Sequence, residues 1–156
     1  MNERWIWTLR YAVVIALALV LGAALGEMDL FKASRLGKTG LNASHIARFL
    51  GFGGALLALW FLARRAASVL ASQGERANLV AQCLLPLTTL IVVASTHAVL
   101  LLVLKPLMSR GVLQAYNWLF ITAIILSAAW LVMALFTGTA SLSKILGVGP
   151  RSLRHR

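Results

Sequence analysis

The chain alternates between four long apolar stretches and short polar segments. A helix needs roughly 20 mostly apolar residues to cross about 30 Å of hydrocarbon, and residues 5–26, 46–66, 77–104 and 113–136 meet that requirement. The third stretch contains no charged residue. None of the four shows the strict alternation of a transmembrane β-barrel strand. The pattern therefore predicts an all-α membrane protein, a bundle of four transmembrane helices.

The segments between these stretches differ in length. Residues 27–44 form the one sizeable loop, in which Asn42 or Ser44 is expected to cap the second helix. The other two links are short, so consecutive helices should pack as antiparallel neighbours. The predicted domains are thus a transmembrane domain, residues 1–136, and a basic tail, residues 137–156.

Composition supports a membrane protein. Apolar residues make up 60% of the chain and charged residues 12%, whereas soluble domains are nearer half apolar and a quarter charged. A soluble domain of 156 residues could not bury so much apolar surface in one core. The net charge of +11 would suggest nucleic acid in a soluble protein. Here the charges flank the apolar stretches, so they indicate topology, and no nucleic-acid partner is expected.

The basic residues also predict an orientation, because four spans put both termini on one side. Nine of the 15 lie on the side of the termini: Arg4, Arg10, Arg64, Arg65, Arg76, Lys144, Arg151, Arg154 and Arg156. Six lie on the other side: Lys32, Arg35, Lys38, Arg48, Lys105 and Arg110. Cytoplasmic segments carry the excess of Lys and Arg. Both termini are therefore expected in the cytoplasm, with the protein in a bacterial inner membrane.

The first stretch has an alternative interpretation as a signal peptide. Its basic start, apolar middle and small residues near Gly22 fit that description. The apolar stretch is long for a signal peptide, so a retained helix is favoured.

Polar residues gather on one side of the third predicted helix. At 100° per residue, one arc of about 100° contains Gln82, Pro86, Thr89, Thr96 and His97. We expect this face to turn inward, away from lipid. Ionisable groups at membrane depth are functional candidates, and His97 is the one that qualifies.

His97 allows three interpretations. Paired with His45 it could hold a b-type haem, or it could contact a quinone, although the two histidines match poorly in depth. A proton or ion pathway would normally need a buried acid, yet the four acids, Glu3, Glu27, Asp29 and Glu75, lie at the edges or outside. The simplest interpretation is that the polar face hydrogen-bonds neighbouring helices or a partner subunit. The single Cys83 excludes a paired-thiol redox enzyme.

Small residues and the basic tail suggest contacts with helices and lipid. Gly22 and Gly26 form a G-x-x-x-G pair in the first helix, and Gly51 and Gly54 thin the second. Such residues let helix backbones approach closely, within the chain or against a partner helix. The tail residues expected to meet an anionic leaflet or an acidic partner subunit are Lys144, Arg151, Arg154 and Arg156.

Residues 42–135 carry features of a known family. These are a helix ending in Leu62-Ala63-Arg64-Arg65, a second helix opening with Leu85-Pro86-Leu87, a short turn, and a helix containing Ala129-Trp130-Leu131. The region resembles the N-terminal membrane part of larger channels of the small-conductance mechanosensitive (MscS-like) superfamily. The resemblance implies lipid-facing helices that respond to membrane tension. Neither a Gly/Ala-rich pore helix nor a cytoplasmic β-domain follows in the sequence, so no pore residue is carried over.

These patterns favour a small non-enzymatic membrane protein, an accessory or scaffold subunit of a larger inner-membrane complex. The sequence holds no phosphate-binding loop, metal-ligand cluster or nucleophile constellation. Expected partners are membrane lipids, anionic lipid included, and other membrane subunits or further copies of the chain. One alternative is an oligomeric transport or tension-sensing module. The other is an electron-transfer subunit that binds haem or quinone.

Overall fold

The computed structural model describes residues 6–35, 37 and 40–145, with side chains described except at 75, 76, 79 and 138–145. Its helices are α1 (Ile6–Glu27), α2 (Asp29–Ala33), α3 (Ala43–Ala71), α4 (Glu75–Leu104) and α5 (Arg110–Ile145). Four of them, α1, α3, α4 and α5, are long and apolar enough to cross a membrane. The predicted all-α fold with four transmembrane helices is therefore confirmed.

Helix α3 begins directly after Asn42, one of its two candidate capping residues. Asn42 is extended, with φ −101° and ψ 152°, and is the N-cap of the helix. Its backbone N–H donates to Nδ1 of His45 at 3.4 Å, which forms one half of a capping box. At the other end of α3, Gly74 has φ +116°. This conformation, which glycine adopts readily, lets the chain turn into α4 within three residues.

Three elements differ from what the sequence predicted, and one of them is α3, which extends beyond the expected residues 46–66 at both ends. The short helix α2 lies in the loop and has Asp29 in its first turn and Lys32 in its last. These charges suit the helix dipole. Helix α5 continues to Ile145, so the first part of the segment expected as a tail is helical.

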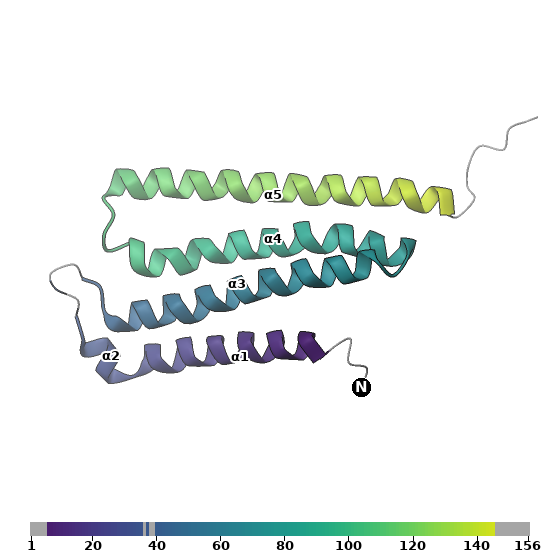
Figure 1. The fold of residues 1–156 in the computed structure, drawn as a ribbon. Helices are drawn as coiled ribbons and strands as arrows, with labels where there is room; N and C mark the ends of the chain where they lie inside the picture. The colour runs from purple at the N-terminus through teal and green to yellow at the C-terminus, as the bar shows by residue number, and fades with distance from the viewer. Residues whose placement is uncertain (1–5, 36, 38–39, 146–156) are drawn as a thin grey trace, which may run out of the picture.

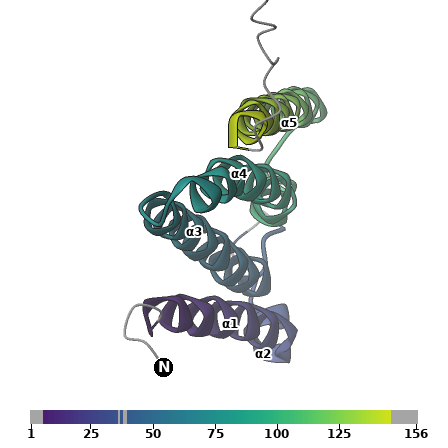
Figure 2. The same ribbon diagram turned by 90° about the vertical axis from the view of Figure 1, so that its right-hand side faces the viewer.

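The four long helices form an open row (Figures 1 and 2). Helix α1 contacts α3, α3 contacts α4, and α4 contacts α5, while α2 touches α1 and α3. No other pair of these helices is in contact within the described residues. Along the helix axes, the start of α1 and the end of α5 lie on the same side of the molecule, which is called the termini end below. The opposite end, which contains α2 and the α4–α5 link, is called the α2 end.

The helices meet through small side chains. Buried positions between them include Gly22, Gly26, Ala55, Ala63, Ala67, Ala81, Thr88 and Ser127. Small residues at such contacts are typical of membrane proteins, where close van der Waals packing drives helix association. At most 11% of the most apolar window of any span is buried within the chain. The remaining apolar surface must be covered by lipid or by other protein.

Candidate functional site

The α2 end holds a charged cluster that ties α1 to α3. Arg48 of α3 forms an ion pair with Glu27 and donates to the carbonyl oxygen of Gly26 at 3.3 Å. Lys32 pairs with the other oxygen of Glu27 at 2.7 Å. The last carbonyls of a helix lack intrahelical donors and carry partial negative charge. Arg48 therefore caps the end of α1 as well as pairing with its final side chain.

Just below this cluster, α1 and α3 approach through glycine. A Cβ built on Gly22 would lie 2.9 Å from Cα of Gly51. One built on Gly51 would lie 2.7 Å from the carbonyl oxygen of Ala18. Real Cβ atoms essentially never come so close, so this crossing requires glycine. The Arg48 side chain occupies the space where a Cβ on Gly26 would lie. Gly54, in contrast, has no atom within 4 Å of its Cβ position.

The predicted polar face of α4 is divided in the structure. Pro86 is fully buried inside the continuous helix. Thr96 lines an apolar groove between α3 and α4 with a volume of about 330 Å³. Thr89 is half-buried, but Gln82 is exposed near the termini end. Thr88, absent from the predicted face, is buried instead.

His97 lies in a polar and aromatic cluster between α4 and α5. Its Nε2 is 3.2 Å from Oδ1 of Asn117, and the Tyr116 hydroxyl donates to the His97 carbonyl oxygen at 3.0 Å. The imidazole stacks on the Tyr116 ring, with centroids 5.3 Å apart, and meets the Phe120 ring edgewise. Because Oδ1 of an amide accepts, Nε2 of His97 carries the proton in this arrangement. The cluster therefore joins the two helices through side chains of both.

The two histidines have different neighbours. His45 accepts from Asn42 at the start of α3, whereas His97 contacts α5, and α3 and α5 do not touch within the described residues. Among the described side chains, no group of three His, Cys, Asp or Glu residues is arranged to hold a metal ion. The haem or quinone hypothesis stays a prediction.

Sequence reasoning did not pick out Asn117 or the Arg48–Glu27 pair. Asn117 sits between Tyr116 and Trp118, two aromatic residues of the kind enriched at membrane interfaces. Asn117 lies seven residues after the start of α5, and His97 lies seven residues before the end of α4. This matching depth in two antiparallel helices was the signal that could have paired them.

The predicted tail contacts are largely beyond what the structure describes. Lys144 belongs to α5, but its side chain is not described. Arg151, Arg154 and Arg156 lie outside the described residues. Their proposed contact with lipid or an acidic partner stays a prediction.

Fold and site together define a small integral membrane protein with four helices crossing the bilayer. Comparison of the chain with protein-family models, curated proteins and solved structures gives no match. The resemblance of residues 42–135 to mechanosensitive channels is thus neither supported nor contradicted.

Proposed function

We propose that this chain is a non-enzymatic accessory subunit that binds another helix within the membrane, in a bacterial inner membrane with both termini cytoplasmic. The observation that carries the proposal is the open row. Helix α5 contacts α4 alone among the described helices, so its opposite face is uncovered by the chain itself.

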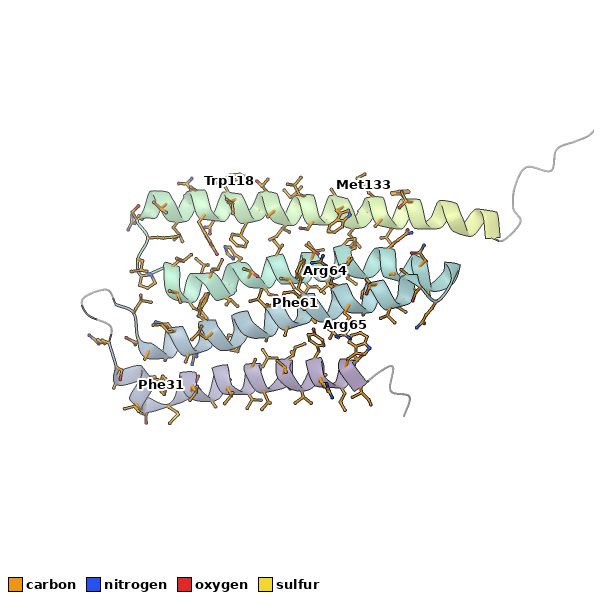
Figure 3. The ribbon with its side chains drawn as sticks, in the orientation of Figure 1. Phe31, Phe61, Arg64, Arg65, Trp118 and Met133 are labelled. Carbon is orange, nitrogen blue, oxygen red and sulfur yellow. The ribbon has the colours of Figure 1, made fainter. Side chains whose placement is uncertain are left out.

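The uncovered face of α5 suits a protein partner. Alternating steps of four and three residues define a stripe of exposed positions, Trp118, Thr122, Ile125, Ala129, Val132 and Phe136. This spacing keeps one seam facing a second helix along its length. The small Thr122 and Ala129 within the seam permit close backbone approach. Figure 3 shows Trp118 and Met133 on the side of α5 away from α4.

The exposed face of α1 provides the contrast. The exposed positions Leu9, Val13, Leu17 and Val20 on α1 do not follow that alternation, because they are spaced by four, four and three residues. All four are branched aliphatic residues, which suit contact with acyl chains. We therefore assign α1 to the lipid boundary and α5 to the partner. The basic tail adds a contact with anionic lipid or with an acidic partner segment.

The experiment is affinity purification from membranes in mild detergent, followed by mass spectrometry of the intact assembly. We expect a defined partner, another membrane protein or a second copy of this chain. Changing Thr122 and Ala129 together to Leu should release it, because both small positions of the seam are filled. The matched control, Ala16→Leu with Val20→Leu, adds the same number of side-chain heavy atoms at exposed positions of α1 and should retain it.

Two outcomes contradict the proposal. One is a chain that leaves the membrane as a stable monomer with no partner in stoichiometric amount. The other is equal release of the partner by the α5 and α1 variants, since a specific seam on α5 would then be refuted.

A further inference from the structure

Two arginines at the termini end rest on tryptophan rings. The guanidinium carbon of Arg65, on α3, lies 5.1 Å from the ring centroid of Trp7, on α1. That of Arg64 lies 5.6 Å from the ring of Trp60, one turn earlier on the same helix. Figure 3 shows Arg64 and Arg65 on α3 towards the termini end. Both arginine side chains are exposed, while both tryptophans are half-buried.

Arg64 and Arg65 differ from the charged cluster of Lys32, Arg48 and Glu27 in their partners. At the α2 end, Lys32 and Arg48 both pair with Glu27. In the described part of the chain, no carboxylate lies within ion-pairing distance of Arg64, Arg65 or the nearby Arg10. The termini end therefore presents positive charge that described acidic side chains do not neutralise.

The two guanidinium groups have donors left for a ligand. An arginine carries five N–H donors, and neither Arg64 nor Arg65 forms an ion pair with a described carboxylate. The fork of donors matches two oxygens of a phosphate. Stacking also restricts two long side chains before any ligand arrives, which reduces the entropy lost on binding.

Depth places the pair at the membrane surface. Arg48 and Arg64 are sixteen residues apart on α3, which is about 24 Å of helix. The hydrocarbon core is roughly 30 Å thick, so Arg48 and Arg64 lie near its two opposite boundaries. Arg64 and Arg65 are then close to the headgroups of one leaflet, beside tryptophans of the kind enriched there.

We propose that Arg64 and Arg65, held on Trp60 and Trp7, form a binding site for the phosphate of an anionic phospholipid headgroup. A zwitterionic headgroup carries its own cation beside the phosphate, so it gains less from two guanidinium groups that no described carboxylate neutralises. The bound lipid bridges α1 and α3 at the termini end, opposite to the Arg48–Glu27 pair at the α2 end. This site is separate from the tail and from the α5 seam, and it stands whether or not a partner subunit exists.

The test is native mass spectrometry of the purified full chain, titrated with phosphatidylglycerol or phosphatidylcholine. We expect preferential binding of one phosphatidylglycerol. An arginine near an anionic surface is worth about fivefold in affinity, so Arg64→Gln with Arg65→Gln should weaken that binding about 30-fold. The Lys pair, Arg64→Lys with Arg65→Lys, keeps the charge but loses the fork and should fall between the two.

The matched control is Lys105→Gln with Arg110→Gln, which removes the same charge from exposed positions at the α2 end. It should leave phosphatidylglycerol binding within about twofold of the unaltered chain. If the double Gln variant loses helical circular dichroism, Arg64→Gln alone serves, because that side chain stacks within its own helix.

Three results overturn the proposal. The first is equal affinity for the two lipids, and the second is an equal loss in the control variant, which would leave net charge as the cause. The third is displacement of the lipid by millimolar inorganic phosphate, which would make the site a binder of free anions.

Discussion

The glycine crossing of α1 and α3 gives the sharpest test of the fold. Gly51→Ala adds one methyl group where a Cβ would lie 2.7 Å from the Ala18 carbonyl oxygen and 2.8 Å from the Gly22 nitrogen. Both obstacles are backbone atoms, so no side chain can rotate away. Ordinary contact begins near 3.4 Å, and the helices must separate to restore it.

The expected magnitude follows from that separation. Overpacking of this kind typically costs about 1–3 kcal/mol. The Gly54→Ala control adds the same methyl group three residues later on the same helix, where nothing lies within 4 Å. Removing a helical glycine there should stabilise by about 0.5–1 kcal/mol. The two variants should therefore shift stability in opposite directions and differ by about 1.5–4 kcal/mol.

The assay is reversible unfolding in mixed micelles, with increasing dodecyl sulfate and helical circular dichroism or steric trapping as the signal. The midpoint should fall for Gly51→Ala and rise slightly for Gly54→Ala. Equal midpoints would show that α1 and α3 do not cross at Gly22 and Gly51, and the assigned helix contact would then be wrong.

Three further predictions follow from the polar contacts and the topology. Tyr116→Phe, which removes the hydrogen bond to the His97 carbonyl oxygen, should cost about 0.6–1.7 kcal/mol in the same unfolding assay. The control Thr122→Val, which removes a hydrogen bond within α5 only, should cost less. A larger cost for Thr122→Val would argue against a role of Tyr116 in joining α5 to α4. Glu27→Gln should lower the unfolding midpoint because Arg48 and Lys32 both lose their partner, and the difference should shrink in high salt; an unchanged midpoint at low salt contradicts this. In intact cells a membrane-impermeant maleimide should label Ser109→Cys but not Ser72→Cys, both in a Cys83→Ser background, and the opposite pattern would invert the proposed orientation.

The membrane spans were predictable because a long uninterrupted apolar stretch is itself the signal. A stretch such as residues 77–104, long and uncharged, has few alternatives to a membrane helix. Asn42 was predictable as a cap because capping depends on residues a few positions apart. The short links also indicated antiparallel neighbours, and α3, α4 and α5 pack in that order.

The contacts between helices were harder to predict, for a physical reason. Helix α1 is apolar on every side, so its pattern does not show which face meets α3. Gly22 and Gly51 were both recognised as small, but only their crossing shows that one fits the other. Gly54 has the same local pattern and no neighbour. Arg48 and Glu27 lie on different helices, and no local sequence pattern shows that these two residues are neighbours. This ion pair is therefore also seen only in the structure.

The polar contacts between helices are concentrated in the half of the helix length nearest the α2 end. The Arg48–Glu27 pair and the glycine crossing tie α1 to α3 near the α2 end, and the His97 cluster ties α4 to α5 in the same half. Between α3 and α4 the small buried residues Ala63, Ala67 and Ala81 continue the contact to the termini end, where the link through Gly74 closes the hairpin. Helices α1 and α5 flank this hairpin, and near the termini end Arg65 of α3 lies over the ring of Trp7 of α1. A lipid phosphate bound there would add to the contact between α1 and α3, so lipid composition would affect how these helices pack as well as where the protein sits in the bilayer.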